Sequence, residues 1–450
     1  AKDFLNMYQT DIEALVHRDY NHPSVIMYSI GNEVTEPAEK RGVDLALEMT
    51  ELIHGLDPTR PVTCGVNLWL ISKSAKGKSV YDEQGKSDKK DKQINSTVFN
   101  LITSMVGTKM NNSSKSKKVD AVTSPVLDVL DIAGYNYSSG RYSLEGRAHP
   151  DRIVVGSETF PQDIAKNWRM VQELPYLIGD FMWTCWDYLG EAGIGAWSYS
   201  PDARGFNKPY PWLLAEAGAF DILGNPTAEV FHASAVWGTA KNPGLAVQPP
   251  NHPNEKISKM VWRGTNAIPS WSWMACDGNM AVVEVYSSCP VVELLLNGQS
   301  LGQKKTKDCK AVFRVRYASG HLTAVAFDVS GKETGKTTLQ SASGSIGIEV
   351  TSEVLAVKTG SIAYVRVSLV GENGIVECNA DREISLSVSG CELLAFGSAN
   401  PRTEERYNSK TATTYYGKAL AVVRATKEGS IVIAATDSQS VDAVASITVN

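Results

Sequence analysis

Residues 24–33 read SVIMYSIGNE, a continuous apolar run that stops at an Asn-Glu pair. A short apolar run bounded by turn residues predicts a strand that is buried on both faces, as in a parallel sheet. A second run, from Arg152 to Glu158, repeats the pattern and also ends in a glutamate. Barrel enzymes place their reactive groups at the carboxyl ends of such strands. Cleaving a glycosidic bond with a carboxylate pair requires at least two carboxyl groups, and Glu33 and Glu158 are two strand-end glutamates.

From residue 1 to about residue 240, apolar runs alternate with helical patterns, which predicts βαβ units and a parallel sheet. We expect strands at 24–30, 61–66, 130–135, 152–156 and 177–183, and helices at 2–19, 38–55, 96–106, 121–130 and 162–174. Glu158 follows Glu33 by 125 residues, which corresponds to three βα steps longer than those of an ordinary eightfold barrel. The lysine-rich stretch 71–120 accounts for the excess, and we interpret it as a solvated insertion with one short helix.

After about residue 250 the helical periodicity disappears and alternating strands take over. The pair Asn297-Gly298 between two apolar runs is the strongest short hairpin signal. We expect further strands at 281–286, 311–317, 321–328, 362–370, 384–389, 419–425 and 430–436. Strands about ten residues apart with glycine-rich turns are typical of β-sandwiches. The predicted domains are 1–245, a partial barrel, followed by two sandwiches at 255–345 and 346–450.

The composition excludes several classes of protein. At 450 residues the chain is too long for a single core. Its net charge of -5 argues against a nucleic-acid partner, because no basic excess exists to neutralise phosphates. No apolar stretch is long enough to span a bilayer, so we expect no membrane insertion. The seven cysteines lack any CxxC spacing, which disfavours both a disulfide scaffold and a zinc site. We expect a soluble protein; periplasmic or secreted localisation in a bacterium is one alternative, and the sequence does not decide it.

Either glutamate taken alone could equally be a helix cap or part of a solvated loop. The residues before Glu33 change this balance, because 17–33 (HRDYNHPSVIMYSIGNE) closely resemble the acid/base signature of glycoside hydrolase family 2. The resemblance implies that Glu33 is the acid/base and that Asn32 contacts the sugar 2-hydroxyl. The stretch 156–159 (GSET) resembles the nucleophile strand of the same family, which makes Glu158 the implied nucleophile.

Two further stretches resemble family 2 strands. Residues 133–137 (AGYNY) resemble the sixth strand, which implies that Tyr137 hydrogen-bonds the nucleophile with Asn136 beside it. Residues 179–188 (GDFMWTCWDY) resemble the eighth strand, and the resemblance implies that Trp183 forms an apolar floor for a sugar ring. Asp187, after this strand, either binds substrate hydroxyls or caps a loop.

The resemblance implies hydrolysis of terminal β-glycosides by double displacement with retention of configuration. No cofactor is required; some family members bind Mg²⁺ or Na⁺, but no clear ligand set for either, and no metal site, is evident in the sequence. We predict a β-galactosidase, because two sandwiches after the barrel resemble bacterial β-galactosidases of the family. The glucuronidase branch holds the substrate carboxylate with an Asn-x-Lys motif, whereas Asn207 and Lys208 are adjacent here. A β-glucuronidase, another family 2 β-glycosidase and a non-catalytic carbohydrate-binding fragment are the alternatives.

Family members also carry two domains and three barrel strands before the Asn-Glu strand, and this chain has none of them. The predicted fold is therefore α/β plus all-β: strands four to eight of a (β/α)8 TIM barrel, followed by two immunoglobulin-like sandwiches. A five-stranded arc has two open edges and a half-exposed core. We therefore expect three kinds of partner: a glycoside or oligosaccharide substrate, the missing N-terminal half of the same enzyme, and other copies in a homo-oligomer. Because substrate contacts from the absent strands would be missing, the chain alone is expected to be weakly active or inactive.

Overall fold

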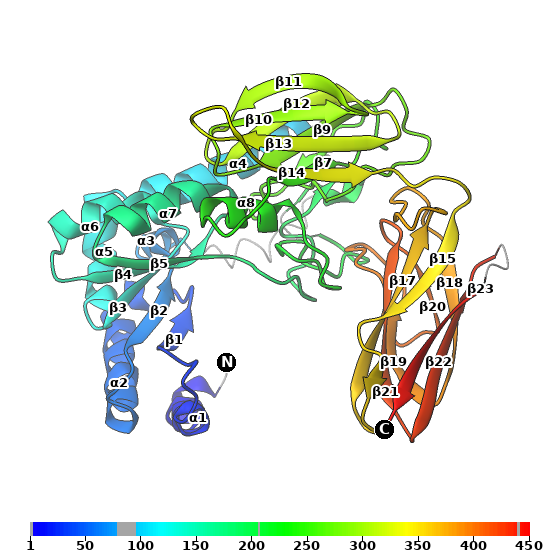
Figure 1. The fold of residues 1–450 in the computed structure, drawn as a ribbon. Coiled ribbons are helices and arrows are strands. Elements are labelled where there is room, and N and C mark those ends of the chain that lie inside the picture. Colours follow the sequence, from blue (N-terminus) through cyan, green and yellow to red (C-terminus); the bar gives the residue numbers. More distant parts are fainter. Residues whose placement is uncertain (1–2, 79–95, 206–207, 439–441) are drawn as a thin grey trace. The chain divides into compact units, whose positions relative to one another are not determined.

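The computed structural model describes residues 3–78, 96–205, 208–438 and 442–450. These residues form two compact units (Figure 1). Unit 1 runs to Thr184 and includes Met260–Trp262, and unit 2 holds Cys185–Lys259 and Arg263–Asn450. None of the described helices is both long enough and apolar enough to cross a membrane.

Unit 1 is built on a five-stranded parallel sheet in the order β1-β2-β3-β4-β5. Its strands are β1 (Tyr28–Asn32), β2 (Val62–Val66), β3 (Ile132–Asn136), β4 (Ile153–Thr159) and β5 (Leu177–Met182). All five coincide with strands predicted from the sequence, although β1 begins four residues later. The delay arises because Val25 donates its N–H to the carbonyl of His22 in a turn that precedes the strand.

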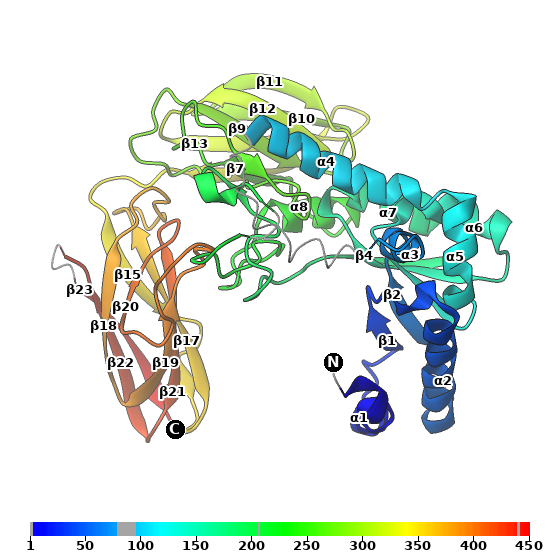
Figure 2. The ribbon, with the colours of Figure 1, turned by 180° about the vertical axis from the view of Figure 1, so that it is seen from behind.

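Helices separate the strands of unit 1. They are α1 (Phe4–Asp19), α2 (Lys40–Leu56), α3 (Leu68–Ser74), α4 (Ser96–Ser113), α5 (Lys117–Leu127), α6 (Tyr142–Ala148) and α7 (Ile164–Glu173), with short 3-10 turns at η1 (Glu36–Ala38), η2 (Ser139–Arg141) and η3 (Pro161–Asp163). Figures 1 and 2 show α2, α3, α5, α6 and α7 packed along the strands. Their apolar side chains and those of one sheet face form a single core, which includes Val16, Ile53, Val62, Val126, Tyr135, Tyr142, Val154 and Leu177.

The other face of the unit 1 sheet carries exposed apolar side chains. Ile178 and Phe181 on β5 are 51% and 57% exposed, and Ile153 on β4 is also exposed. Val154 and Leu177 belong to the core that packs on the helices, and side chains alternate along a strand, so their neighbours Ile153 and Ile178 lie on the opposite face. Phe181 lies there too, because its neighbour Asp180 accepts a hydrogen bond from Tyr142 of that core. Within the described residues β1 and β5 are the edge strands, as expected for an arc of a barrel rather than a closed one.

The prediction that 71–120 is a solvated insertion is wrong for part of that stretch. Residues 79–95 lie outside the described residues, but α4 runs to Ser113, seven residues beyond the predicted helix, and α5 begins already at Lys117. Met110 on α4 is buried in a small cluster with Tyr137 and Phe160. Met110 and the partly buried Val106 therefore belong to the packing of unit 1, whereas Met105 is exposed.

Unit 2 begins with an irregular segment, which includes β6 (Trp197–Ser198), η4 (Pro201–Ala203), α8 (Ala228–Val236) and β8 (Ser258–Lys259). Seven strands then form two facing sheets: β12-β9-β7 and β11-β10-β13-β14. Their bounds are β7 (Gly244–Gln248), β9 (Met280–Tyr286), β10 (Val291–Leu296), β11 (Gln299–Lys305), β12 (Lys310–Arg316), β13 (His321–Phe327) and β14 (Glu333–Gln340). The predicted hairpin is confirmed, because β10 and β11 are antiparallel and Asn297 and Gly298 both have positive φ angles.

The C-terminal strands form a second pair of sheets, β15-β17-β21-β19 and β16-β23-β22-β18-β20. Their bounds are β15 (Gly347–Ser352), β16 (Ala356–Val357), β17 (Ile362–Val370), β18 (Glu383–Ser389), β19 (Cys391–Gly397), β20 (Thr411–Thr413), β21 (Lys418–Ala425), β22 (Gly429–Thr436) and β23 (Asp442–Val449). A separate buried cluster fills the space between these sheets. The sequence therefore placed the β-rich part correctly, while the exact domain limits and the immunoglobulin-like assignment stay predictions.

Candidate active site

The carboxyl ends of the unit 1 strands are irregular where the candidate residues lie. The pairings of β1 with β2, β3 with β4 and β4 with β5 each shift register within their last residues. Such bulges re-aim side chains and occur often beside active sites. Glu33 and Tyr137, each directly after a strand, have φ angles of 51°, which is uncommon for residues other than glycine. The surrounding structure therefore has to hold Glu33 and Tyr137 in an unfavourable backbone conformation.

Glu33 follows β1 and is held by amide donors. Its N–H donates to the carbonyl of Gly65, which continues the ladder between β1 and β2. Its side-chain Oε1 accepts a hydrogen bond from Nδ2 of Asn67 at 2.8 Å and from Nδ2 of Asn136 at 3.3 Å. A carboxylate that accepts such bonds is stabilised in its ionised form and fixed in orientation.

Glu158 lies near the end of β4, opposite Asn136 of β3. Burial raises the pKa of the Glu158 carboxyl above its ordinary value, and the nearby charge of Glu33 raises it further. Hydrogen bonds from Tyr137, Asn32 and Asn136 oppose this rise. The two glutamates are thus electrostatically coupled, as expected of a carboxylate pair that shares one site.

Asn136 connects the two glutamates. It is fully buried, and its Nδ2 donates to Oδ1 of Asn32 at 2.9 Å as well as to Glu33. Its Oδ1 accepts a hydrogen bond from Oγ of Ser157 at 2.6 Å. Because an ionised carboxylate can only accept, the amide nitrogen of Asn136 is the atom that faces Glu33, and Oδ1 faces the hydroxyl of Ser157.

Tyr137 is held from the other side by aromatic packing. Its ring lies 4.6 Å from that of Phe160 and 6.1 Å, edge-on, from that of Trp262, measured between centroids. Burial and the charges of Glu158 and Glu33 raise the pKa of Tyr137 well above its ordinary value, so its hydroxyl stays protonated and remains a donor.

The structure therefore brings together Glu33, Glu158, Asn32, Asn136 and Tyr137, all of which were predicted from the sequence; their catalytic roles stay predictions. Trp183 directly follows β5, with its N–H bonded to the carbonyl of Thr159 and its side chain half-buried. Its predicted contact with a sugar ring also stays a prediction.

Three residues of the site were missed: Asn67, Ser157 and Trp262. Asn67 follows a predicted strand directly, as Glu33 does, so the same signal could have found it. Ser157 precedes the candidate nucleophile, but its partner depends on the bulge between β3 and β4. Trp262 lies more than 100 residues further along the chain, and no local pattern indicates its place.

Among the described residues, no group of three or more His, Cys, Asp and Glu side chains is placed to hold a metal ion. Cys64 lies on β2, and burial raises the pKa of its thiol to about 12. A thiol with so high a pKa stays protonated and is a poor nucleophile. All seven cysteines are free.

Three stretches of the chain match known domain families. Residues 2–122 match the family described as "Glycosyl hydrolases family 2, TIM barrel domain", and residues 346–445 match "Glycoside hydrolase family 2 C-terminal domain 5". Residues 278–335 match a domain of unknown function, DUF4982. A solved structure of a glycosyl hydrolase family 2 member from Bacteroides cellulosilyticus superposes with a TM-score of 0.81 at 30% identity, over 100% of this chain and 52% of that chain.

The chain belongs to glycoside hydrolase family 2. A curated relative, "Beta-galactosidase BoGH2A" from Bacteroides ovatus, is 23% identical over 94% of this chain and 49% of its own length. A "Putative beta-glucuronidase" from Formosa agariphila is 25% identical over 75% of this chain and 30% of its own length. This family 2 chain thus spans about half, or less, of the curated relatives it matches.

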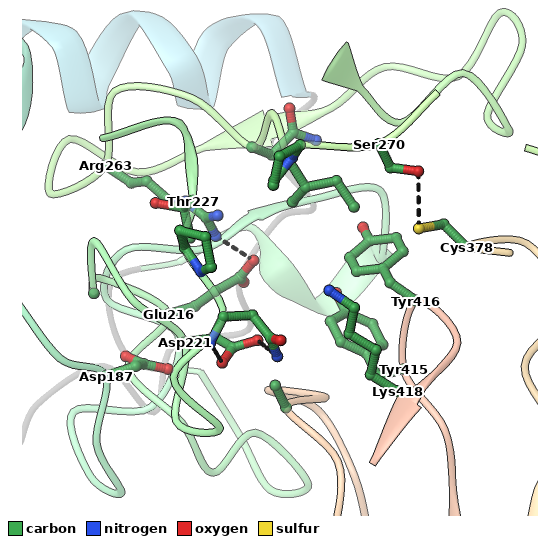
Figure 3. Close-up of a pocket in the computed structure, with 17 residues that line it drawn as sticks. Asp187, Glu216, Asp221, Thr227, Arg263, Ser270, Cys378, Tyr415, Tyr416 and Lys418 are labelled. Carbon is green, nitrogen blue, oxygen red and sulfur yellow. Dashed lines mark hydrogen bonds and ion pairs between the residues drawn. The ribbon is translucent and has the colours of Figure 1, made fainter. Parts of the chain in front are cut away.

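The family 2 chain also holds a cavity of about 70 Å³ within unit 2, whose lining includes several charged side chains (Figure 3). Glu216 and Arg263 form an ion pair at 2.8 Å on one side, and the rings of Tyr415 and Tyr416 lie on the other. Burial raises the pKa of Glu216 to about 7, although Arg263 opposes the rise. Asp187 lines the cavity and accepts the N–H of Ala217 at 3.2 Å, which supports the loop-capping reading of that residue.

Proposed function

We propose that the chain carries the catalytic carboxylates of a retaining β-glycosidase that hydrolyses terminal β-D-galactosides. The observation that supports this most directly is the hydrogen-bonded arrangement of Glu33, Asn136, Asn32 and Glu158 at the carboxyl ends of β1, β3 and β4. It supplies one carboxyl group to protonate the leaving oxygen and a second to attack the anomeric carbon.

In the proposed reaction Glu158 attacks the anomeric carbon while Glu33 donates its proton to the glycosidic oxygen. The bond to the leaving group breaks and a glycosyl-enzyme ester forms on Glu158. Glu33, now ionised, takes a proton from water, which attacks the same carbon and releases Glu158. We propose retention because the segments that carry Glu33 and Glu158 resemble the acid/base and nucleophile segments of family 2.

The preference for a galactoside over a glucuronide is supported by two observations. The similarity to the β-galactosidase from Bacteroides ovatus extends over nearly the whole chain. The adjacent pair Asn207-Lys208 is the nearest counterpart of an Asn-x-Lys motif in this chain. Its lysine, Lys208, is buried and donates to the backbone carbonyls of Gly193 and Gly205. Its ammonium is therefore already bonded within unit 2, while Asn207 lies outside the described residues.

We also propose that full activity needs barrel strands supplied by further sequence of the same enzyme. The exposed apolar face of β4 and β5 and the open edges at β1 and β5 support this. The catalytic test is therefore best made on the full-length gene product that contains this sequence.

The test is a panel of aryl β-glycosides assayed with that protein and with its Glu158→Gln variant. We expect the highest kcat/KM with the β-galactoside, and a loss of about 10⁴-fold in the variant with binding of galactose retained, because the nucleophile is absent. Lys208→Met is the control, and we expect it to leave the preference unchanged. A higher kcat/KM with the β-glucuronide contradicts the substrate. Galactoside binding without turnover on any substrate favours a carbohydrate-binding protein instead.

A further inference from the structure

The candidate nucleophile Glu158 lies in a bulge of β4. Over this stretch β4 uses residues 156–159 where β5 uses 180–182, and it uses 155–158 where β3 uses 134–136. β4 therefore carries one residue more than either of its neighbours. A slip of one residue would move side chains of β4 to the other face of the sheet, so the bulge has to be held for Glu158 to keep its direction.

Two hydroxyl groups beside the candidate nucleophile tie the bulge to the neighbouring strands. Ser157, before it, donates to Oδ1 of Asn136 on β3 at 2.6 Å. The hydroxyl of Thr159, after it, lies 2.8 Å from Oδ2 of Asp180 and 3.1 Å from the carbonyl oxygen of Phe181, both on β5. Thr159 is buried, and whichever of these two oxygens receives its proton, the hydroxyl is bonded to β5.

Asp180 reaches across the bulge. Its backbone pairs with Gly156, before the extra residue, and its side chain binds Thr159, after it. Glycine at position 156 leaves room for this, because a Cβ there would lie 2.3 Å from Oδ1 of Asp180. One residue of β5 is therefore joined to both ends of the bulge.

Asp180 is itself anchored by two helices. Tyr142 on α6 donates to its Oδ1 at 2.8 Å, and Asn167 on α7 donates to its Oδ2 at 3.2 Å. Thr159 shares Oδ2 with Asn167, so its bond does not involve the hydroxyl of Tyr142. A carboxyl group with several donors is fixed in orientation, which makes it a firm partner for the hydroxyl of a strand.

We propose that Asp180 is a positioning residue: by binding the hydroxyl of Thr159 it closes the bulge of β4 and holds Glu158 against its hydrogen-bond donors. Those donors are Tyr137, Asn32 and Asn136. Asp180 acts through Thr159 and the backbone of β4, and its importance for hydrolysis rests on the proposed role of Glu158 as the nucleophile. The charge of Glu33 also acts on Glu158, and that of Asp163 acts on Asp180.

Two consequences are expected when the hydroxyl of Thr159 is removed. The bulge relaxes and Glu158 loses part of its contact with the donors that lower its pKa, so the pKa of Glu158 rises, by about one unit. The attacking oxygen is also displaced. We expect kcat of the full-length protein to fall by about 10²-fold, because small misplacements of a reacting group are costly.

The variants separate the hydroxyl from the shape of the side chain. Thr159→Val removes the hydroxyl and keeps the branched shape, whereas Thr159→Ser keeps the hydroxyl and should behave as the wild type. Thr63→Val is the matched control. Thr63 on β2 is also buried, and its hydroxyl donates to the carbonyl of Ile132 at the start of β3, at 2.8 Å. This variant therefore loses a comparable bond between two strands at the other end of β3.

The measurement is a ¹³C NMR titration of the chain labelled at the glutamate carboxyl carbon, with the Glu158 signal identified by its loss in Glu158→Gln. We expect the pKa of Glu158 to rise by about one unit in Thr159→Val and to stay within about 0.3 units of the wild type in Thr159→Ser and Thr63→Val. The signal comes from folded molecules, so a loss of stability alone does not produce the rise.

A pKa in Thr159→Val within about 0.3 units of the wild type overturns the proposal, as does an equal rise in Thr159→Ser or in Thr63→Val. If Thr159→Val does not fold, Thr159→Ala takes its place, because alanine places no branched methyl group against Asp180. An unchanged pKa of Glu158 in Thr159→Ala then overturns the proposal.

The titration needs no turnover, so it separates this inference from the proposed function. A raised Glu158 pKa in Thr159→Val, together with a full-length protein that hydrolyses no glycoside, supports the contact of Asp180 with the bulge and contradicts the hydrolase. Conversely, hydrolysis by the wild type with an equal kcat in Thr159→Val overturns the positioning role while the hydrolase stands.

Discussion

At the scale of single residues, the ionisation of Glu158 decides the pH at which the proposed reaction begins. A nucleophile must be ionised, and burial and the charge of Glu33 raise the pKa of this carboxyl. We therefore expect the acid limb of the kcat/KM profile to lie above the ordinary glutamate value of about 4.5. Activity should be lost as the pH falls through the raised pKa, because the carboxylate is then protonated.

Replacing Tyr137 by phenylalanine tests this reading. The hydrogen bond from Tyr137 lowers the pKa of Glu158, so Tyr137→Phe is expected to raise that pKa and move the acid limb to higher pH. The pH profile of kcat/KM for the full-length protein measures the shift. Tyr142→Phe is the matched control, because the hydroxyl of Tyr142 donates to Asp180 instead. An acid limb at the same pH in both variants would contradict the assignment.

The residues of the site could be predicted only as far as local motifs reach. Glu33 and Asn32 belong to one continuous stretch, and Glu158 and Tyr137 end two other strands, so each had a sequence signal. The contacts among them had none, because the bulge between β3 and β4 sets Asn136 opposite Glu158. Trp262 packs on Tyr137 from a distant segment, and its position depends on tertiary folding alone.

At the scale of elements, the close spacing of β1, β2 and β3 holds the asparagines in contact. A Cβ at Gly65 on β2 would lie 2.3 Å from Oδ1 of Asn32 and 3.1 Å from Oδ1 of Asn136. Glycine at this position therefore leaves the room that the amide network occupies.

Gly65→Ala should displace this network. We expect kcat/KM to fall by about 10²-fold, because small misplacements at a reacting site are costly, and the free energy of unfolding to fall by about 1–3 kcal/mol. Enzyme assays and denaturant unfolding measure the two effects. Gly179→Ala on β5 is the control, since its added Cβ meets nothing closer than Val155 Cγ2 at 3.8 Å. Equal losses of activity in both variants would show that the spacing at Gly65 has no special role.

The elements were predicted best where periodicity was strong. All five strands of unit 1 and the hairpin at Asn297 follow from apolar runs and turn residues. The short helices α3 and α6 were missed, since seven residues carry too little helical pattern to detect. The end of α4 was missed because lysine and asparagine there resemble a solvated loop, whereas Met110 is held in place by Tyr137 and Phe160.

At the scale of the whole molecule, each unit has its own buried clusters, so we expect separate unfolding transitions. Unit 1 exposes apolar side chains such as Ile178 and Phe181 on one sheet face, which lowers the apolar area buried by its fold. We therefore expect unit 1 to unfold at the lower temperature. The sequence predicted the open sheet but gave no sign of the cavity at Glu216 in unit 2, because its walls come from segments far apart in the chain.

That cavity makes the stability of unit 2 depend on pH. The Glu216 side chain is 16% exposed, and its pKa in the folded chain is about 7, against an ordinary value of 4.5. Between these values the folded state binds a proton that the unfolded state has lost, so stability falls as the pH rises through this window and levels off above it. We expect the difference in unfolding free energy between wild type and Glu216→Gln to change by about 3 kcal/mol from pH 4 to pH 8, in favour of the variant.

Calorimetry of the second transition across this pH range measures the change in unfolding free energy, with the exposed Glu404→Gln as control. Parallel pH curves for wild type and Glu216→Gln would show that the carboxyl ionises normally, and a change confined to the first transition would assign the effect to unit 1.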